Sequence, residues 1–310
     1  MSRTGGSGEA AAPVYLISPS GAVGADAPVQ RALSHLRQAG FAPTLDRAAL
    51  RVRQRFAGSD EDRAGAFARA AAQSADIVMI TRGGYGLTRI LPALDYRALA
   101  RARKRWVGLS DFTAFQLAML ARARAVTWSG PTLLDDFGAE RFEDIDEVTL
   151  GTFSEAMSGA LEAVGFRCNG PAGVEARGTL WGGNLSIVCA LLGTPWFPKV
   201  AGGILFVEDV NEHPYRVERM LTQLLHAGVI DRQKAVVLGY FNRYRLSEND
   251  RGFDLAAVVK WLRAQTATPI ITGLPYGHAS PKLTLPHGAQ VALAVEGRTC
   301  YLVLEEDHRH

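Results

Sequence analysis

The chain has 310 residues and a formal net charge of +3 at pH 7; hydrophobic residues make up 47% of it and charged residues 21%. This profile is typical of a soluble globular protein long enough for two domains, and no apolar stretch is long enough to span a bilayer. Arginine is scattered over predicted helix faces without a nucleic-acid-binding motif, so we expect neither a nucleic-acid nor a membrane partner.

The N-terminus and the cysteines indicate the compartment. Residues 1–12 are small and polar and lack the apolar segment of a secretory signal, so we predict a disordered lead-in. The three cysteines, Cys168, Cys189 and Cys300, lie far apart and suggest neither a disulfide framework nor a zinc site. We therefore expect a protein of the reducing cytoplasm, with no metal and no cofactor.

Residues 13–135 alternate short apolar runs with helical patterns. This alternation predicts a parallel sheet with helices on both faces, in which ligands bind beyond the carboxyl ends of the strands. Four features follow predicted strands at that edge: Ser20, the loop 83–86, Ser110 and Ser129. Predicted strands lie at 14–18, 41–45, 76–81, 106–109 and 126–128, and predicted helices at 29–39, 60–74 and from the Ser110 turn to about 123.

Ser110 follows an apolar run as part of a Gly-x-Ser sequence, and a helical pattern begins at once. A serine on such a sharp strand-to-helix turn holds its hydroxyl clear of the sheet, above the free N–H groups of a helix N-terminus. Because these groups can bind an oxyanion, the turn predicts a nucleophile. The alternative is a helix cap at Ser110, with Asp111 complementing the helix dipole, since Phe112 replaces the second glycine of a nucleophile elbow.

A glycine-rich loop, Gly83-Gly84-Tyr85-Gly86, follows the predicted strand 76–81. It matches neither a dinucleotide-binding fingerprint nor a Walker loop. Its glycines let backbone N–H groups approach a substrate closely. We therefore predict an oxyanion donor in this loop that complements the N–H group of Asp111.

The alternation of strands stops over residues 136–175, which begin in a strongly acidic stretch. The acids do not have EF-hand spacing, so a charged, helical linker between two domains is expected in preference to a metal site.

Residues 176–310 mix strand types and predict a smaller α+β domain that ends in an antiparallel hairpin. His278 lies in a Gly/Pro-rich loop beyond a predicted buried strand, which suits a general base; the alternative is a histidine bonded to backbone. Glu208 ends another predicted strand and can orient an imidazole. Asp209 and Glu212 compete for that role, and a surface ion pair is the alternative for Glu208.

Five stretches, in this order along the chain, resemble the LD-carboxypeptidase family of serine peptidases, which includes muramoyltetrapeptide carboxypeptidases and microcin C immunity peptidases. The resemblance covers most of the chain, from about residue 14 to residue 295. The stretches are 80–86 (ITRGGYG), 107–114 (VGLSDFTA), 182–185 (GGNL), 205–210 (LFVEDV) with 215–216 (YR), and 273–278 (GLPYGH).

The resemblance implies a flavodoxin-like parallel-sheet N-terminal domain and a swivelling C-terminal domain, with a Ser-Glu-His triad shared between them. Ser110 would be the nucleophile, Glu208 the orienting carboxylate and His278 the base. The backbone N–H groups of Asp111 and Gly84 would form the oxyanion hole, and a homodimer is expected. The candidate substrate-binding residues are Arg82, Gly83, Tyr85 and Asn184 in the matching stretches, and Trp181, which directly precedes one of them.

The predicted function is hydrolysis of the L,D-peptide bond before a C-terminal D-amino acid, with a murein tetrapeptide as substrate and peptidoglycan recycling as context. Arg82, Arg89 and Arg216 are candidates for binding the terminal carboxylate. One alternative is an immunity-type peptidase that cleaves aminoacyl-nucleotide conjugates, with Trp181 or Trp196 stacked on the base. Another is a non-catalytic small-molecule binding protein on the same scaffold.

Overall fold

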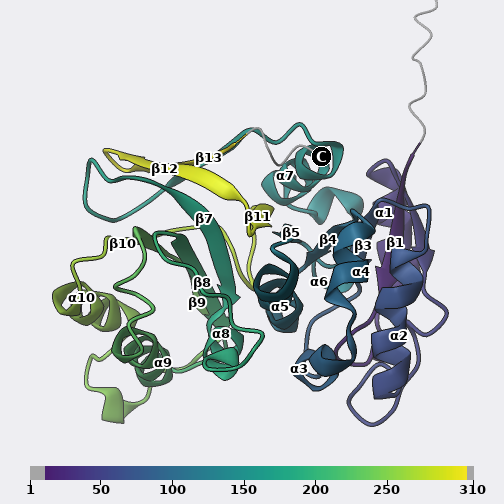
Figure 1. The fold of residues 1–310 in the computed structure, drawn as a ribbon, viewed down its shortest axis with the longest axis horizontal. Helices are drawn as coiled ribbons and strands as arrows, with labels where there is room; N and C mark the ends of the chain where they lie inside the picture. The colour runs from purple at the N-terminus through teal and green to yellow at the C-terminus, as the bar shows by residue number, and fades with distance from the viewer. Residues whose placement is uncertain (1–10, 306–310) are drawn as a thin grey trace, which may run out of the picture.

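Two β-sheets lie side by side in the computed structural model, which describes residues 11–305 (Figure 1). The first sheet is rich in parallel strands and the second is mixed, so the predicted α/β fold class is confirmed. Residues 1–10 of the predicted lead-in, 1–12, lie outside the described residues. Strand β1 begins at Ala12, within the predicted lead-in. The domain boundaries at 135 and 175 stay a prediction.

The first sheet has six strands in the order β11-β5-β4-β3-β1-β2. Its first five strands along the chain pair in parallel, and alternate residues of β1 and β3 belong to different buried clusters, so both faces of the sheet are covered. The parallel strands are β1 (Ala12–Ile17), β2 (Phe41–Leu45), β3 (Ile77–Ile80), β4 (Arg105–Gly108) and β5 (Thr127–Ser129).

Helices of the first half follow these strands, and several begin at side chains that cap them. The start of α2 is a capping box, in which the Ser59 hydroxyl accepts from the Asp62 N–H and the Asp62 carboxylate accepts from the Ser59 N–H. The helices are α1 (Val29–Gln38), α2 (Asp60–Ala71), α3 (Leu87–Ile90), α4 (Tyr96–Arg101), α5 (Thr113–Ala123), α6 (Leu133–Asp136) and α7 (Glu147–Ser158).

The second sheet has seven strands in the order β10-β9-β8-β7-β12-β13-β6. The strands β7 to β10 pair in parallel, whereas β12, β13 and β6 pair in antiparallel fashion. The strands are β6 (Ala163–Arg167), β7 (Glu175–Asn184), β8 (Ile204–Val210), β9 (Ala235–Asn242), β10 (Ile270–Thr272), β12 (Gln290–Glu296) and β13 (Thr299–Leu304), and the helices are α8 (Leu185–Leu191), α9 (Pro214–His226) and α10 (Leu255–Gln265).

The strands β6 and β11 are among those that lie where the sequence pattern predicts none. The segment expected to be a linker contains α7 and also β6, whose Val164 and Phe166 are buried against β13. Residues 285–287 form β11 (Leu285–His287), which leaves the second half and pairs with β5 at the edge of the first sheet. The two halves of the chain are therefore joined through a shared sheet as well as through side chains.

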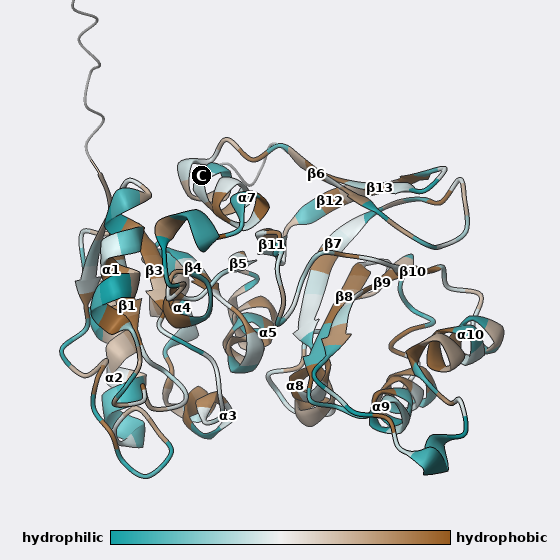
Figure 2. Ribbon diagram, turned by 180° about the vertical axis from the view of Figure 1, so that it is seen from behind, coloured by the Kyte–Doolittle hydropathy of each residue, from teal (hydrophilic) through white to brown (hydrophobic). Residues whose placement is uncertain are grey.

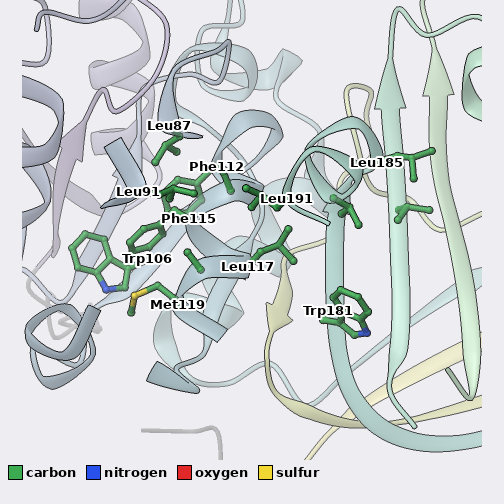
Figure 3. Close-up of a cluster of buried hydrophobic side chains, with 14 of the residues drawn as sticks. Leu87, Leu91, Trp106, Phe112, Phe115, Leu117, Met119, Trp181, Leu185 and Leu191 are labelled. Atoms are coloured by element: carbon green, nitrogen blue, oxygen red, sulfur yellow. The ribbon is translucent and has the colours of Figure 1, made fainter. Parts of the chain in front are cut away.

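Helix α5 lies between the two sheets, and its side chains connect their cores (Figure 1). Figure 3 shows one buried cluster that extends from Trp106 and Phe115 in the first half to Trp181 and Leu185 in the second. Hydrophobic residues concentrate in strands such as β3 and β8, and hydrophilic residues gather on the outer helices α1 and α2 (Figure 2). The catalytic candidates on either side of α5 are thus held against one continuous core.

His287 in β11 is a fully buried histidine whose two ring nitrogens have no hydrogen-bond partner among the described residues. Its ring lies edge-on to that of Phe206, with 6.2 Å between the ring centroids. Burial penalises the imidazolium and lowers the pKa of His287 to about 3. The folded chain therefore holds His287 neutral at pH values where an unfolded chain protonates it.

We expect His287 to make the protein less stable as the pH falls below about 6.5. Between this value and pH 3 the unfolded chain binds a proton at His287 that the folded chain does not, so the free energy of unfolding decreases with decreasing pH. From pH 7 to pH 5 the decrease amounts to about 2 kcal/mol. Urea unfolding of wild type and His287→Leu at both pH values measures it.

The comparison of the two proteins isolates this effect. Burial raises the pKa of Asp209 to about 6, which has the opposite sign and stabilises the folded state as the pH falls from 6 towards 3.8. That contribution is common to both proteins and cancels in the difference. The control is His226→Gln, a substitution at an exposed position. We expect this variant to keep the wild-type dependence of the free energy of unfolding on pH. A His287→Leu protein that keeps the wild-type pH dependence would contradict the prediction.

Candidate active site

Ser110 lies just beyond the carboxyl end of β4, on a single 3₁₀ turn, η2 (Ser110–Phe112), that leads directly into α5. Its backbone φ is 66°, in the left-handed region that residues other than glycine rarely adopt. Such strain persists only where the surrounding structure determines the conformation, often at a functional site. The N-cap residue of α5 is Phe112, so Ser110 does not cap this helix.

Gly83 packs directly against Ser110. A Cβ atom at position 83 would lie 2.6 Å from Ser110 Cβ and 2.9 Å from Ser110 Oγ, so only glycine fits without displacing the hydroxyl. The next residue, Gly84, has a φ of 117° and packs against the backbone of Gly21. The loop 83–86 is therefore held close to the serine by its backbone, as an oxyanion-binding loop requires.

Asp111 joins this loop to the serine turn. Its side chain is buried, and its Oδ2 accepts a hydrogen bond from the N–H group of Leu87, the first residue of α3, at 2.9 Å. Since Leu87 directly follows the glycine loop, the Asp111 carboxylate positions that loop against the turn that carries Ser110. The two proposed sources of oxyanion donors, Asp111 and Gly84, lie on these joined segments.

Replacing Gly83 with alanine is expected to lower kcat about 100-fold in a protein that stays folded. The new methyl group overlaps Ser110 Cβ and displaces the hydroxyl from the position in which it can attack the substrate carbonyl. A displacement of about 1 Å has an effect of this size. Steady-state hydrolysis of a murein tetrapeptide, with thermal unfolding alongside, measures it. A Cβ at Gly24 meets no atom within 4 Å, so Gly24→Ala is the control. An unchanged kcat in Gly83→Ala would contradict this packing.

Glu208 and His278 form a hydrogen-bonded pair in the second half of the chain. Glu208 lies near the end of β8 with a fully buried side chain, and its Oε2 is 2.8 Å from His278 Nδ1. The His278 side chain keeps 14% of its surface exposed, so one edge of the ring is accessible to a ligand. A buried carboxylate in this position fixes the tautomer and orientation of the imidazole.

Glycines on both sides of Glu208 allow this approach. Gly277, immediately before His278, has a φ of 128°, and a Cβ there would lie 2.8 Å from Glu208 Oε2. Gly239 in β9 packs behind Glu208, and a Cβ there would lie 2.5 Å from the carbonyl oxygen of Tyr276. The loop that carries His278 can therefore lie directly on the carboxylate only because both positions lack a side chain.

The other two acids that competed as orienting groups point elsewhere. Asp209 accepts hydrogen bonds from Asn184 Nδ2 at 3.1 Å and from the backbone N–H of Ser186 at 2.9 Å. Burial, followed by the nearby charge of Glu208, raises the pKa of Asp209 to about 6. Glu212 forms an ion pair with Arg216 at 3.4 Å.

Asn184 connects the two halves of the site. Its side-chain Nδ2 donates to Glu208 Oε1 at 3.1 Å, and its backbone N–H donates to Thr113 Oγ1 at 2.9 Å. Thr113 begins α5, three residues after Ser110.

Among the described residues, no hydrogen bond joins the hydroxyl of Ser110 to His278. Catalytic hydrogen bonds are often long in unliganded proteins and shorten when substrate is bound.

The remaining predicted binding residues are distributed over surface and core. Tyr85 is exposed in the glycine loop, whereas Trp181 is fully buried and its indole N–H donates to Gln233 Oε1 at 3.0 Å. Trp181 therefore belongs to the core and offers no open face for stacking a base. The half-buried Arg82 donates to the carbonyl oxygen of Ala22 at 3.0 Å.

Several acids of residues 136–175 take part in ion pairs or helix caps. Asp136 pairs with the buried Lys282 at 2.7 Å, and the Asp146 carboxylate caps α7. Within residues 11–305, no group of three or more His, Cys, Asp or Glu side chains could hold a metal ion. Nor does that part of the chain contain a helix long and apolar enough to cross a membrane.

Sequence reasoning missed two contributors to this region. Thr113 was not predicted as a link between the halves, because nothing in its local pattern distinguishes it from other residues in the first turn of a helix. Arg55 was not predicted either, although the structure places its exposed side chain over the ring of Tyr85, with 5.6 Å from the guanidinium carbon to the ring centroid.

Comparison with known proteins identifies the family. The model of the LD-carboxypeptidase N-terminal domain matches residues 14–130, and that of the C-terminal domain matches residues 177–293. The chain belongs to the LD-carboxypeptidase family. All three members of the Ser110, Glu208 and His278 set fall within the matched ranges, on the two sides of the segment that neither model covers.

Individual members of the LD-carboxypeptidase family are similar over most of their length. The crystal structure of a muramoyltetrapeptide carboxypeptidase from Oxalobacter formigenes matches with a TM-score of 0.87 and 41% identity, covering 95% of this chain and 99% of that one. A probable murein peptide carboxypeptidase of Bacillus subtilis is 28% identical over 87% of this chain and 85% of its own. The microcin C7 self-immunity protein MccF of Escherichia coli is 26% identical over 71% of this chain and 72% of its own.

Proposed function

We propose that this protein is a serine carboxypeptidase that hydrolyses the L,D-peptide bond before a C-terminal D-amino acid, with a murein tetrapeptide as substrate and D-alanine as a product. The observation that carries the proposal is the 2.8 Å contact between His278 Nδ1 and Glu208 Oε2. Glu208, which orients this imidazole, lies in a strand that is hydrogen-bonded, through Asn184, to the helix that follows Ser110. Membership of the LD-carboxypeptidase family supports the same chemistry.

In the proposed reaction, Ser110 Oγ attacks the carbonyl carbon of the scissile bond while His278 takes the hydroxyl proton. The negative charge on the carbonyl oxygen is stabilised by the backbone N–H groups of Asp111 and Gly84. His278 then gives its proton to the amine of the departing D-amino acid, which leaves an ester on Ser110. Water, deprotonated by His278, hydrolyses the ester and restores the serine.

Glu208 stabilises the positive charge on His278 during both halves of this reaction. Its carboxylate is fully buried and is held from its other oxygen by Asn184, so it needs little reorganisation when the imidazolium forms. We place this activity in cytoplasmic recycling of peptidoglycan peptides by a homodimeric enzyme.

The direct test is incubation of the full chain with a murein tetrapeptide and assay of free D-alanine. The control substrate is the same peptide with L-alanine at its C-terminus. We expect D-alanine from the first substrate and no cleavage of the second. A folded protein that releases no D-alanine would overturn the proposal.

A second candidate is cleavage of aminoacyl-nucleotide conjugates, which the similarity to MccF favours. The burial of Trp181 removes one of the two tryptophans considered for stacking on the nucleotide base, and the half-buried Trp196 is the one that remains. Parallel assays with the murein tetrapeptide and an aminoacyl sulfamoyl adenosine discriminate between the two. A higher kcat/KM for the sulfamoyl compound would favour the second candidate.

A further inference from the structure

A carboxypeptidase must recognise the free carboxylate at the end of its substrate. The usual recognition group is an arginine whose guanidinium is not already neutralised, because its planar fork of N–H groups matches the two carboxylate oxygens. The inference that follows rests on the proposed function, since it assigns the residue that binds this carboxylate.

The three arginines suggested by the sequence already have partners. Arg89 forms an ion pair with Asp60 at 2.9 Å, and Arg216 forms one with Glu212 at 3.4 Å. Arg82 donates to a backbone carbonyl oxygen of the neighbouring loop. A substrate carboxylate would have to compete with an existing interaction at each of these side chains.

Arg55 differs from these three. It lies in the loop between β2 and α2, its side chain is exposed, and its guanidinium makes no ion pair with any acid in the described part of the chain. The guanidinium carbon lies 5.6 Å from the centroid of the Tyr85 ring. A cation at this distance from an aromatic face is held loosely in place and keeps its N–H groups available.

The backbone around Arg55 is fixed to the glycine loop beside Ser110. The Arg55 carbonyl oxygen accepts a hydrogen bond from the N–H group of Ala22 at 2.9 Å. The preceding residue, Gly21, donates to the carbonyl oxygen of Gly83 at 3.3 Å, and Gly83 in turn packs against Ser110. Arg55 and the nucleophile candidate are thus connected by two backbone hydrogen bonds and by the packing of Gly83 against the Ser110 side chain.

The charge of Arg55 also acts on the serine turn. Burial raises the pKa of Asp111, the residue next to Ser110, and the positive charges of Arg63 and Arg55 oppose this rise. Arg63 is fully buried and pairs with Asp60, so it cannot meet a substrate. Of these two arginines, Arg55 is therefore the one that remains exposed to a ligand.

Three arginines stack on a pair of neighbouring aromatic rings, and their arrangement explains why one arginine has no ion-pair partner. Phe56 and Tyr85 lie 5.9 Å apart, with Arg63 and Arg89 over the Phe56 ring and Arg55 over the Tyr85 ring. Asp60 pairs with both arginines on Phe56, so one carboxylate serves two cations. The group has three arginines and one acid, and Arg55 is the exposed arginine in it that has no ion-pair partner among the described residues, whereas the exposed Arg89 is paired with Asp60.

We propose that the Arg55 guanidinium, seated on the Tyr85 ring beside the glycine loop, binds the C-terminal carboxylate of the substrate. The two N–H groups of its fork would each donate to one carboxylate oxygen. This places the terminal D-residue on the side of Ser110 that faces the glycine loop, and it makes a free carboxylate a requirement for efficient cleavage.

The test compares a murein tetrapeptide that ends in D-alanine with the same peptide ending in D-alaninamide. For wild type, we expect kcat/KM to be higher for the free acid by about 10- to 100-fold, the usual range for a charge-assisted pair. Arg55→Gln is expected to lose this preference, mostly through a higher KM for the acid. Arg55→Lys, which keeps the charge but not the fork, should retain part of it.

The matched control is Arg53→Gln, an exposed arginine two residues earlier in the same loop. It should keep the wild-type preference for the acid. If Arg55→Gln also prefers the acid as strongly as wild type does, the Arg55 assignment is wrong and the proposed function stands.

Calorimetric binding of the same two peptides separates this inference from the proposed function. The measurement uses Ser110→Ala protein with and without Arg55→Gln, so it does not depend on turnover. Acid-selective binding that requires Arg55, in a protein whose wild type cleaves neither peptide, would support the subsite and overturn the proposed hydrolysis. Absence of both cleavage and Arg55-dependent binding would overturn both.

Discussion

Replacing Ser110 with alanine is expected to lower the turnover of a murein tetrapeptide by about a million-fold, because the attacking oxygen is lost and no neighbouring group replaces it. The remaining parts of the site still bind substrate, so KM should change much less than kcat. Alanine can adopt the φ of 66° at this position, as serine does, so the protein should fold. Single-turnover release of D-alanine and a thermal unfolding curve measure the two expectations.

Ser129 provides the matched control for this substitution. It ends β5, the strand next to β4, and its buried hydroxyl accepts from Gln116 Nε2 at 2.9 Å. Ser129→Ala should keep most of the activity, since its oxygen is already used in the core. A serine-directed phosphonylating reagent gives independent evidence: label on any residue other than Ser110, in a protein that cleaves the peptide, would contradict the assignment.

Elements that depend on local pattern could be predicted from the sequence. The apolar run at 77–80 forms β3 because all four of its residues are buried between two layers of helices. The serine turn could be predicted for the same kind of reason, since an apolar strand ends in Gly-x-Ser where a helical pattern begins. Both features are determined by residues that are neighbours in the chain.

Elements that depend on distant partners could not be predicted in this way. The strand β11 contains Pro286, which disfavours a central strand, and it forms only because β5 offers an unpaired edge. The ten-residue strand β7 passes through Gly182, whose φ of 135° is unusual for a strand. Close approach of the Phe206 carbonyl makes glycine necessary at this position, and a local pattern does not contain that information.

The candidate site shows the same division. Sequence reasoning placed Ser110, Glu208 and His278 near strand ends and preferred Glu208 as the partner of the imidazole, with Asp209 and Glu212 as competitors. The choice among them depends on Gly277, which brings His278 onto Glu208. Sequence reasoning also could not rank the arginines as binding groups for the substrate carboxylate, because their interaction partners are set by the folded structure.

Replacing Glu208 with glutamine is expected to lower kcat about 10,000-fold, the effect seen when the carboxylate of a serine triad becomes an amide. The glutamine has nearly the same shape, but its amide can present an N–H group to His278 Nδ1, which favours the tautomer that cannot accept the proton from Ser110. At the same position, Asn184 Nδ2 already donates to the other oxygen of Glu208, so the amide cannot satisfy both neighbours with oxygen. Steady-state kinetics, with the thermal unfolding temperature as a check of folding, measure the loss.

The variants Glu212→Gln and Asp209→Asn determine whether this effect belongs to Glu208. Glu212 pairs with Arg216 away from the imidazole, so its substitution should leave kcat within a few-fold of wild type. Asp209 shares Asn184 with Glu208, so its substitution should have an intermediate effect. If Glu208→Gln kept its activity while one of these two variants lost it, the orienting carboxylate would be the other acid, and the 2.8 Å contact between Glu208 and His278 would have no catalytic role.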